Sequence, residues 1–131
     1  MIGLDTNVIV RYLMQDDPTQ ARKAVAVIES LPEHEPAFLS VVTIVEIVWV
    51  LESSFELDRE QVALAVSGLL EARELIVDRA PCVAQAVRAY RRGKADFADT
   101  LIERISKDAG CEATLTFDAR AARDAGMRLI V

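Results

Sequence analysis

The chain has 131 residues, of which 52% are hydrophobic and 27% are charged. These values exclude a disordered chain and predict one domain, residues 1–131, with enough apolar sequence to bury a core. The formal net charge is −6. Taken alone, this charge argues against a nucleic-acid binder, because such proteins usually present a basic surface.

Neither a membrane span nor a targeting segment is expected. The apolar start is broken at Asp5 and is not preceded by basic residues, and no later apolar run reaches the roughly 18 residues that a span requires. Cys82 and Cys111 stand alone, without a CxxC pattern or a neighbouring histidine. Two isolated thiols in a core-forming chain favour free, buried cysteines in a cytoplasmic protein.

Short apolar segments alternate with helical patterns along the first half of the chain. A strand at residues 2–4 leads into a helix that Asp5 or Thr6 can cap and that ends near Met14. The next predicted elements are a helix opened by Pro18, a strand at Ala37–Leu39, a buried helix after Ser40 and a helix opened by Asp58.

The second half repeats this alternation. Its predicted elements are a strand at Glu74–Val77, a helix from Pro81 to Gly93, a helix from Asp96 to Gly110, a strand at Ala113–Thr116, a helix at Ala119–Ala125 and a last strand at residues 128–131. This order predicts the α/β class, with a short parallel sheet of about five strands between two layers of helices. Ligand sites in such sheets form at the carboxyl ends of the strands.

Two acidic residues in the first half suggest such a site. Asp5 follows the first strand, where it can equally serve as a helix N-cap. Glu46 is the only charged residue between Phe38 and Leu51, in a helix that is apolar on nearly every side and is therefore expected to be buried. A buried carboxylate must be paired, protonated or bound to a metal, and a distant arginine is the alternative to a metal.

Three more acids follow in the second half. Asp96 and Asp99 form a D-x-x-D pattern at the start of a helix, and Asp118 follows the strand at Ala113–Thr116. Asp96 and Asp118 can act as N-caps, and Asp99 can interact favourably with the helix dipole. A parallel sheet nevertheless brings such strand ends to one edge, where carboxylates about 4 Å apart repel by roughly 4 kcal/mol at an effective dielectric near 20. Clustered acids without nearby bases therefore predict a site for Mg²⁺ or Mn²⁺.

Most other catalytic chemistries are excluded. His34 is the only histidine and lies in the loop "PEHEP", so neither a histidine pair nor a Ser-His-Asp triad is available. The sequence has no GxSxG, P-loop or GxGxxG motif. Metal-assisted hydrolysis remains, with a water activated by the cation and charge stabilised on phosphate oxygens.

Four segments together resemble the PIN-domain ribonucleases, and most closely the VapC toxins of bacterial toxin–antitoxin pairs. They are "MIGLDTNVIVRYL", "SVVTIVEIVWVL", "GKADFADTLIERIS" and "TLTFDARA", and they occur in the family's order over nearly the whole chain. The resemblance implies a PIN-like three-layer α/β/α fold. It also implies that the four metal-binding and catalytic acids are Asp5, Glu46, Asp99 and Asp118, with Asp5 and Asp99 as the principal ligands.

The resemblance assigns supporting roles as well. Asp96 matches an additional acid of many relatives, and Thr116 falls where they often carry a small hydroxyl residue. Thr6 and Asn7 match the family's D-T-N pattern, in which the asparagine orients the aspartate or the attacking water. None of the four main acids departs from the family pattern.

The activity implied by this resemblance is a Mg²⁺- or Mn²⁺-dependent endonucleolytic cleavage of RNA that leaves a 5′-phosphate and a 3′-hydroxyl. Known members of the family cut tRNA or ribosomal RNA. A cognate VapB-like antitoxin and a homodimer are implied as partners. Basic residues near the acidic motifs are candidates for RNA contact, because they can bind phosphates. They are Arg11, Arg88, Arg91, Arg92 and Lys94. Those at the end of the Pro81–Gly93 helix can equally complement its dipole.

Three alternative functions fit the sequence less well. A haloacid-dehalogenase-like phosphatase needs an aspartate two residues after the first, where this chain has Asn7. A response-regulator receiver needs adjacent acids and a late lysine, but no lysine follows Lys107. A catalytically silent PIN-fold binding module would be expected to lack one of the acids, and none is missing.

Overall fold

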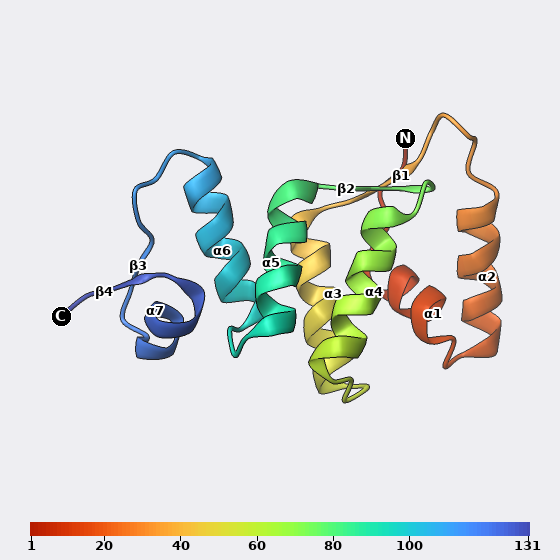
Figure 1. Cartoon of the computed structure of the whole chain (residues 1–131). Coiled ribbons are helices and arrows are strands. Elements are labelled where there is room, and N and C mark those ends of the chain that lie inside the picture. Colours follow the sequence, from red (N-terminus) through yellow and green to blue (C-terminus); the bar gives the residue numbers. More distant parts are fainter. The chain divides into compact units, whose positions relative to one another are not determined.

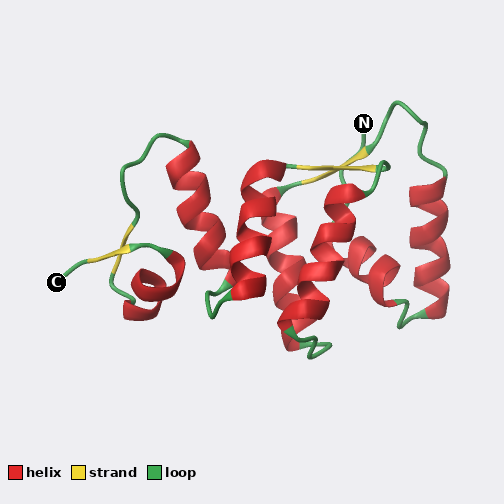
Figure 2. Ribbon diagram, in the orientation of Figure 1, coloured by secondary structure: helices red, strands yellow, loops and turns green.

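The computed structural model describes all 131 residues, as seven helices and four short strands. They form two compact units, Met1–Asp78 and Arg79–Val131, which are described separately (Figures 1 and 2). The α/β class is therefore confirmed. No helix combines the length and the apolar character needed to cross a membrane.

The first unit contains four helices and two strands. In chain order they are α1 (Thr6–Met14), α2 (Pro18–Glu29), β1 (Ala37–Leu39), α3 (Val41–Ser53), α4 (Arg59–Glu71) and β2 (Leu75–Val77). β1 and β2 pair in parallel, with Phe38 opposite Ile76, and Gly3 adds an isolated parallel bridge to Phe38. The expected first strand is thus reduced to a single bridge.

Side-chain caps explain where the helices of this unit begin. Asp5, Asp17, Ser40 and Asp58 stand at the N-caps of α1 to α4, and each accepts a hydrogen bond from a backbone N–H of the first turn. Asp58 also forms a capping box with Gln61. Because such bonds satisfy donors that a helix leaves open, they fix its start by local chemistry.

The core of the first unit is centred on α3, which contacts α1 and α4. Its side chains Ile44, Ile47 and Leu51 are completely inaccessible to solvent. Their spacing of three and four residues places them on one face of the helix. The opposite face of α3 is solvent-exposed, and it carries Glu46.

The second unit consists of α5 (Ala80–Arg92), α6 (Phe97–Asp108), β3 (Leu115–Thr116), α7 (Ala119–Ala125) and β4 (Arg128–Leu129). α5 and α6 pack extensively against each other. At this contact Tyr90 and Phe97 are buried, with an edge-to-face ring arrangement and centroids 5.8 Å apart. β3 and β4 pair in parallel, with Leu115 opposite Arg128. Both cysteines are free; Cys82 is buried as expected, but the expected burial of Cys111 is wrong, because it is exposed in the turn after α6.

The strands are paired inside each unit, as β1–β2 and β3–β4, rather than in the single sheet of about five strands that the sequence predicts. Each strand is only two or three residues long, so a pairing contributes few backbone hydrogen bonds. The helices therefore provide most of the regular structure (Figure 2).

Candidate metal centre

In the first unit, Asp5, Thr6 and Glu46 are connected by hydrogen bonds. The Oδ1 atom of Asp5 accepts a bond of 2.7 Å from the backbone N–H of Thr6, at the start of α1. The Thr6 hydroxyl donates a bond of 2.9 Å to Oε1 of Glu46 on α3. Two of the four predicted acids are thus linked through one threonine, although 40 residues separate Thr6 from Glu46.

The expected burial of Glu46 is wrong, because its side chain is exposed. It shares its face of α3 with Val42 and Trp49, which are 66% and 65% exposed. Positions 42, 46 and 49 follow the helical repeat, so apolar residues occur on the solvent side as well as in the core. Glu46 needs no compensating charge to be tolerated, and its carboxylate is accessible to a ligand.

In the second unit, the acids stand at the starts of α6 and α7. Oδ2 of Asp96 accepts a 3.0 Å bond from the backbone N–H of Asp99. Oδ1 of Asp118 accepts a 2.8 Å bond from the backbone N–H of Arg120. The Thr116 hydroxyl oxygen accepts a 3.0 Å bond from the N–H of Asp118. Thr116 therefore helps to fix the turn that presents Asp118.

Asp99 is in an environment that disfavours its negative charge. Partial burial raises the pKa of its carboxyl group above the ordinary value, and the nearby carboxylates of Asp96 and Asp118 raise this pKa further. Asp99 lies in the first turn of α6, where the helix dipole stabilises an anion. Burial is the largest of the causes that raise this pKa.

The donor set suits a hard divalent cation, because every predicted ligand is a carboxylate and Mg²⁺ and Mn²⁺ prefer oxygen ligands. A cation beside Asp96, Asp99 and Asp118 would also remove the repulsion that raises the pKa of Asp99. No group of three or more histidine, cysteine, aspartate or glutamate side chains converges closely enough in the structure to form a ready-made site.

A family model described as PIN domain matches residues 2–126, which include all of the predicted acids. The chain belongs to the PIN-domain family. PIN domains are typically nucleases that use a divalent metal ion. No curated protein matches the chain significantly.

The predicted RNA-contact residues of the second unit lie at the end of α5 and in the loop that leads to Asp96. All four, Arg88, Arg91, Arg92 and Lys94, are exposed. Lys94 also interacts electrostatically with Asp124 of α7. Their exposure is compatible with phosphate binding, and the contact with RNA stays a prediction.

Two arginines that the sequence reasoning passed over lie on α7. Arg123 forms a two-pronged ion pair with Asp124, with both N–O distances at 3.0 Å. The hydrogen bond from Arg123 lowers the pKa of Asp124, and the charges of Arg123, Lys94 and Arg120 lower it further. The pattern "DARAAR" could have revealed this cluster, because it places Arg120 and Arg123 one turn apart directly after Asp118.

The raised pKa of Asp99 predicts how pH affects the stability of the metal-free PIN domain. Below the ordinary carboxyl value of 3.8 Asp99 is protonated in both the folded and the unfolded chain. As pH rises from there through the raised pKa, the unfolded chain loses this proton first, so the contribution of Asp99 to stability becomes unfavourable. The Asp99→Asn protein should therefore melt at a higher temperature than the wild type at neutral pH.

This difference in melting temperature should shrink towards zero as pH falls to about 3.8. Thermal melts of both proteins across the acid range measure it, and the comparison cancels the titration of groups common to both. Added Mg²⁺ should stabilise the wild type more than the variant. A difference that did not change with pH would contradict the electrostatic explanation.

Proposed function

We propose that this PIN domain is an endoribonuclease that requires Mg²⁺ or Mn²⁺, and that Asp5, Glu46, Asp99 and Asp118 are its metal-binding acids. The observation that supports this most strongly is the family match, which spans all four acids. All four also occupy accessible or partly accessible positions. Both the metal and the RNA could therefore reach them.

The bound cation would activate a water and stabilise negative charge on the phosphate oxygens. The residues of the chain position the groups around it. Thr6 holds the Glu46 carboxylate through its hydroxyl, and Thr116 holds the turn at Asp118. Asp96 holds the first turn of α6, on which Asp99 stands. Asn7, exposed in the first turn of α1, would orient Asp5 or the attacking water.

The proposed reaction is hydrolysis of an internal phosphodiester bond. Water supplies a hydroxyl group to phosphorus, the bond between phosphorus and the 3′ oxygen breaks, and the departing oxygen takes a proton. The products are a 5′-phosphate and a 3′-hydroxyl. No histidine is positioned for a metal-free route, since the only one, His34, lies in the loop between α2 and β1.

We further propose a biological role as a VapC-like toxin in the cytoplasm. Its substrate would be tRNA or ribosomal RNA, its inhibitor a cognate VapB-like antitoxin, and its free state a homodimer. The likeness of the four acidic segments to those of VapC toxins supports this role. A short neighbouring gene for a small DNA-binding protein would be the matching genomic observation.

Metal removal tests the nuclease directly. Purified protein treated with EDTA should not cut total RNA, and Mg²⁺ or Mn²⁺ should restore discrete fragments with 5′-phosphate ends. Mapping these ends by sequencing would identify the substrate. Folded protein that binds Mg²⁺ and leaves RNA intact would contradict the proposal, and would favour the catalytically silent binding module. Hydrolysis of small phosphomonoesters in its place would favour a phosphatase.

A further inference from the structure

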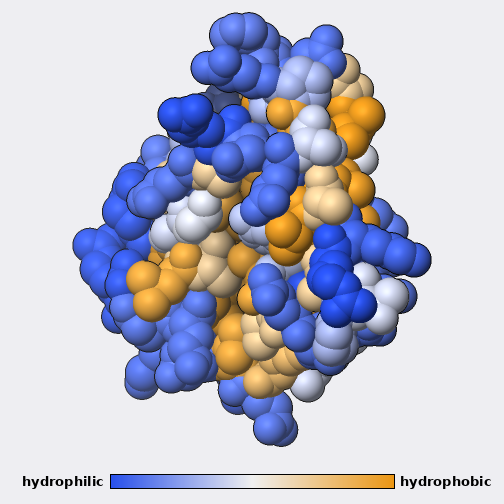
Figure 3. Space-filling model, turned by 90° about the vertical axis from the view of Figure 1, so that its right-hand side faces the viewer, coloured by the Kyte–Doolittle hydropathy of each residue, from blue (hydrophilic) through white to orange (hydrophobic).

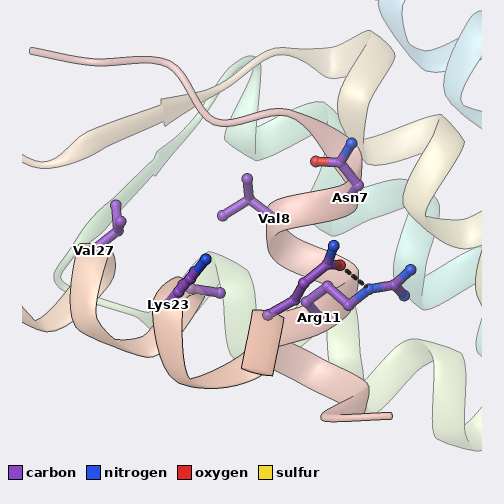
Figure 4. A pocket seen from close by; sticks show the side chains of 7 residues that line it. Asn7, Val8, Arg11, Lys23 and Val27 are labelled. Carbon is purple, nitrogen blue, oxygen red and sulfur yellow. Dashed lines mark hydrogen bonds between the residues drawn. The ribbon is translucent and has the colours of Figure 1, made fainter. Parts of the chain in front are cut away.

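The first unit has a cavity between α1 and α2, with a volume of about 380 Å³. Figure 4 shows its lining, to which α1 contributes Asn7, Val8 and Arg11. From α2 come Gln20, Lys23, Ala24 and Val27. The volume is within the range of small-molecule sites, which begins near 300 Å³. The cavity can thus hold a single nucleotide, but not a stretch of duplex.

Two cations line this cavity, and they differ in their surroundings. Arg11 is held in place, because its Nε donates a 2.7 Å bond to Oε1 of Gln20 and an Nη donates to the Asp16 carboxylate at 3.2 Å. Lys23 is exposed and has neither an ion-pair nor a hydrogen-bond partner in the structure. Asp16 largely compensates Arg11, so Lys23 is the uncompensated positive charge of the cavity.

The remaining lining residues suit the other parts of a nucleotide. Val8, Ala24 and Val27 provide apolar surface for a base or a ribose ring, and the amides of Asn7 and Gln20 offer hydrogen-bonding groups. The surrounding face, which carries α2, is mostly hydrophilic with separate apolar patches (Figure 3). A mixed polar and apolar pocket with one free cation fits a nucleotide better than it fits an apolar peptide.

The position of the cavity connects it to the proposed nuclease site. Asn7 lies two residues after Asp5, in the first turn of the helix that Asp5 caps, and Arg11 lies one turn further along α1. An RNA strand whose scissile phosphate is near Asp5 would therefore have a neighbouring nucleotide at Asn7. Unpaired nucleotides are the parts of RNA that proteins bind in such pockets.

We infer that the α1–α2 cavity binds one unpaired nucleotide of the RNA substrate, next to the bond that is cut, with Lys23 contacting its phosphate. This inference rests on the proposed nuclease function. It adds a binding subsite formed by Asn7, Arg11, Gln20 and Lys23. Of these residues, Gln20 and Lys23 are not singled out by any motif in the sequence.

The test compares Lys23→Gln with Arg22→Gln. Arg22 is the adjacent residue on α2, is also exposed and lacks an ion-pair partner, but it lines a separate hollow together with Pro18 and Val25. Both variants lose one positive charge from the same helix. They therefore separate a contact at the cavity from a change in overall charge.

With a short fluorescein-labelled single-stranded RNA, Lys23→Gln should raise KM about five- to tenfold and change kcat less than about twofold. In binding measured by fluorescence anisotropy, the slope of log K against log salt should fall by about 0.7, as expected for one lost phosphate contact to a single strand. Arg22→Gln should behave as wild type. Lys23→Arg, which keeps the charge, should restore most of the affinity.

Failure of this inference can be distinguished from failure of the proposed function. If the wild type cleaves the RNA and Lys23→Gln matches it, or if Arg22→Gln is equally impaired, the nucleotide subsite is wrong and the nuclease stands. If the wild type binds RNA but never cuts it with Mg²⁺ or Mn²⁺, the nuclease proposal is wrong, and the anisotropy data decide the subsite alone. A labelled amphipathic peptide rich in Glu and Leu serves as a second probe in the same anisotropy assay. If Lys23→Gln weakens the binding of this peptide and leaves the binding of RNA unchanged, the cavity is a protein-binding site and the inference is overturned.

Discussion

Replacing Asp5 or Asp99 with asparagine should reduce the rate of RNA cleavage about 100-fold or more while the protein stays folded. Both residues are proposed principal ligands of the cation, and loss of even an outer partner of a metal site typically costs 10- to 100-fold in affinity or activity. Asparagine keeps the volume of the side chain and one oxygen acceptor, so the cap that Asp5 provides for α1 should be retained. Cleavage of total RNA at saturating Mg²⁺ measures the rate, and circular dichroism verifies the fold.

Asp58→Asn is a matched control for these variants. Asp58 is the N-cap of α4 as Asp5 is the N-cap of α1, but its Oδ1 accepts a 2.8 Å bond from the backbone N–H of Gln61, three residues on, whereas Asp5 accepts from the adjacent Thr6. It lies outside the predicted metal ligands. The control should cleave RNA at the wild-type rate. Equal activity of the Asp5 and Asp99 variants and the wild type would contradict the four-acid site.

The capping role and the proposed ligand role of these acids are compatible. Asp5 uses Oδ1, Asp96 uses Oδ2 and Asp118 uses Oδ1 to accept a backbone N–H at a helix start. The second oxygen of each carboxylate is not used in these capping bonds. A local bond therefore holds the side chain in one orientation, while the other oxygen stays available to a ligand. The N-cap interpretation and the metal-ligand interpretation of each acid can therefore both hold.

The helices could be predicted from the sequence because their starts depend on short-range chemistry. Asp17 before Pro18, Ser40 before Val41 and Asp96 before Phe97 each combine a cap residue with the first helical residue. Such bonds form between residues at most a few positions apart, so one sequence is sufficient to recognise them. The acids of the candidate site were recognisable for the same reason, since most stand at these boundaries.

The features that the sequence did not reveal depend on contacts distant along the chain. The exposure of Glu46 is set by which side of α3 faces the core, and hydropathy alone does not identify that side when Val42 and Trp49 are apolar and exposed. Asp78 was likewise passed over. Its carboxylate accepts a 3.4 Å bond from the backbone N–H of Val41 at the start of α3. The α1–α2 cavity and the place of Lys23 in it also require the packed structure.

A core substitution should have the largest effect on stability. Phe97→Ala is expected to lower the free energy of unfolding by about 3–5 kcal/mol, because the ring is 2% exposed and packs edge-to-face on Tyr90. Phe97 directly follows the Asp96 cap and lies two residues before Asp99. Its packing against α5 therefore also anchors the helix start that presents both acids. Urea denaturation followed by circular dichroism measures the change.

Phe117→Ala makes the same chemical change at an exposed position of the same unit. The Phe117 side chain is 83% exposed, so its removal should change the free energy of unfolding by less than about 0.5 kcal/mol. A loss below about 1 kcal/mol for Phe97→Ala would contradict the packing of α6 on α5. If the loss is as large as expected, RNA cleavage should decline in proportion to the unfolded fraction. A larger decline would indicate that the folded variant also holds Asp99 less firmly at the start of α6.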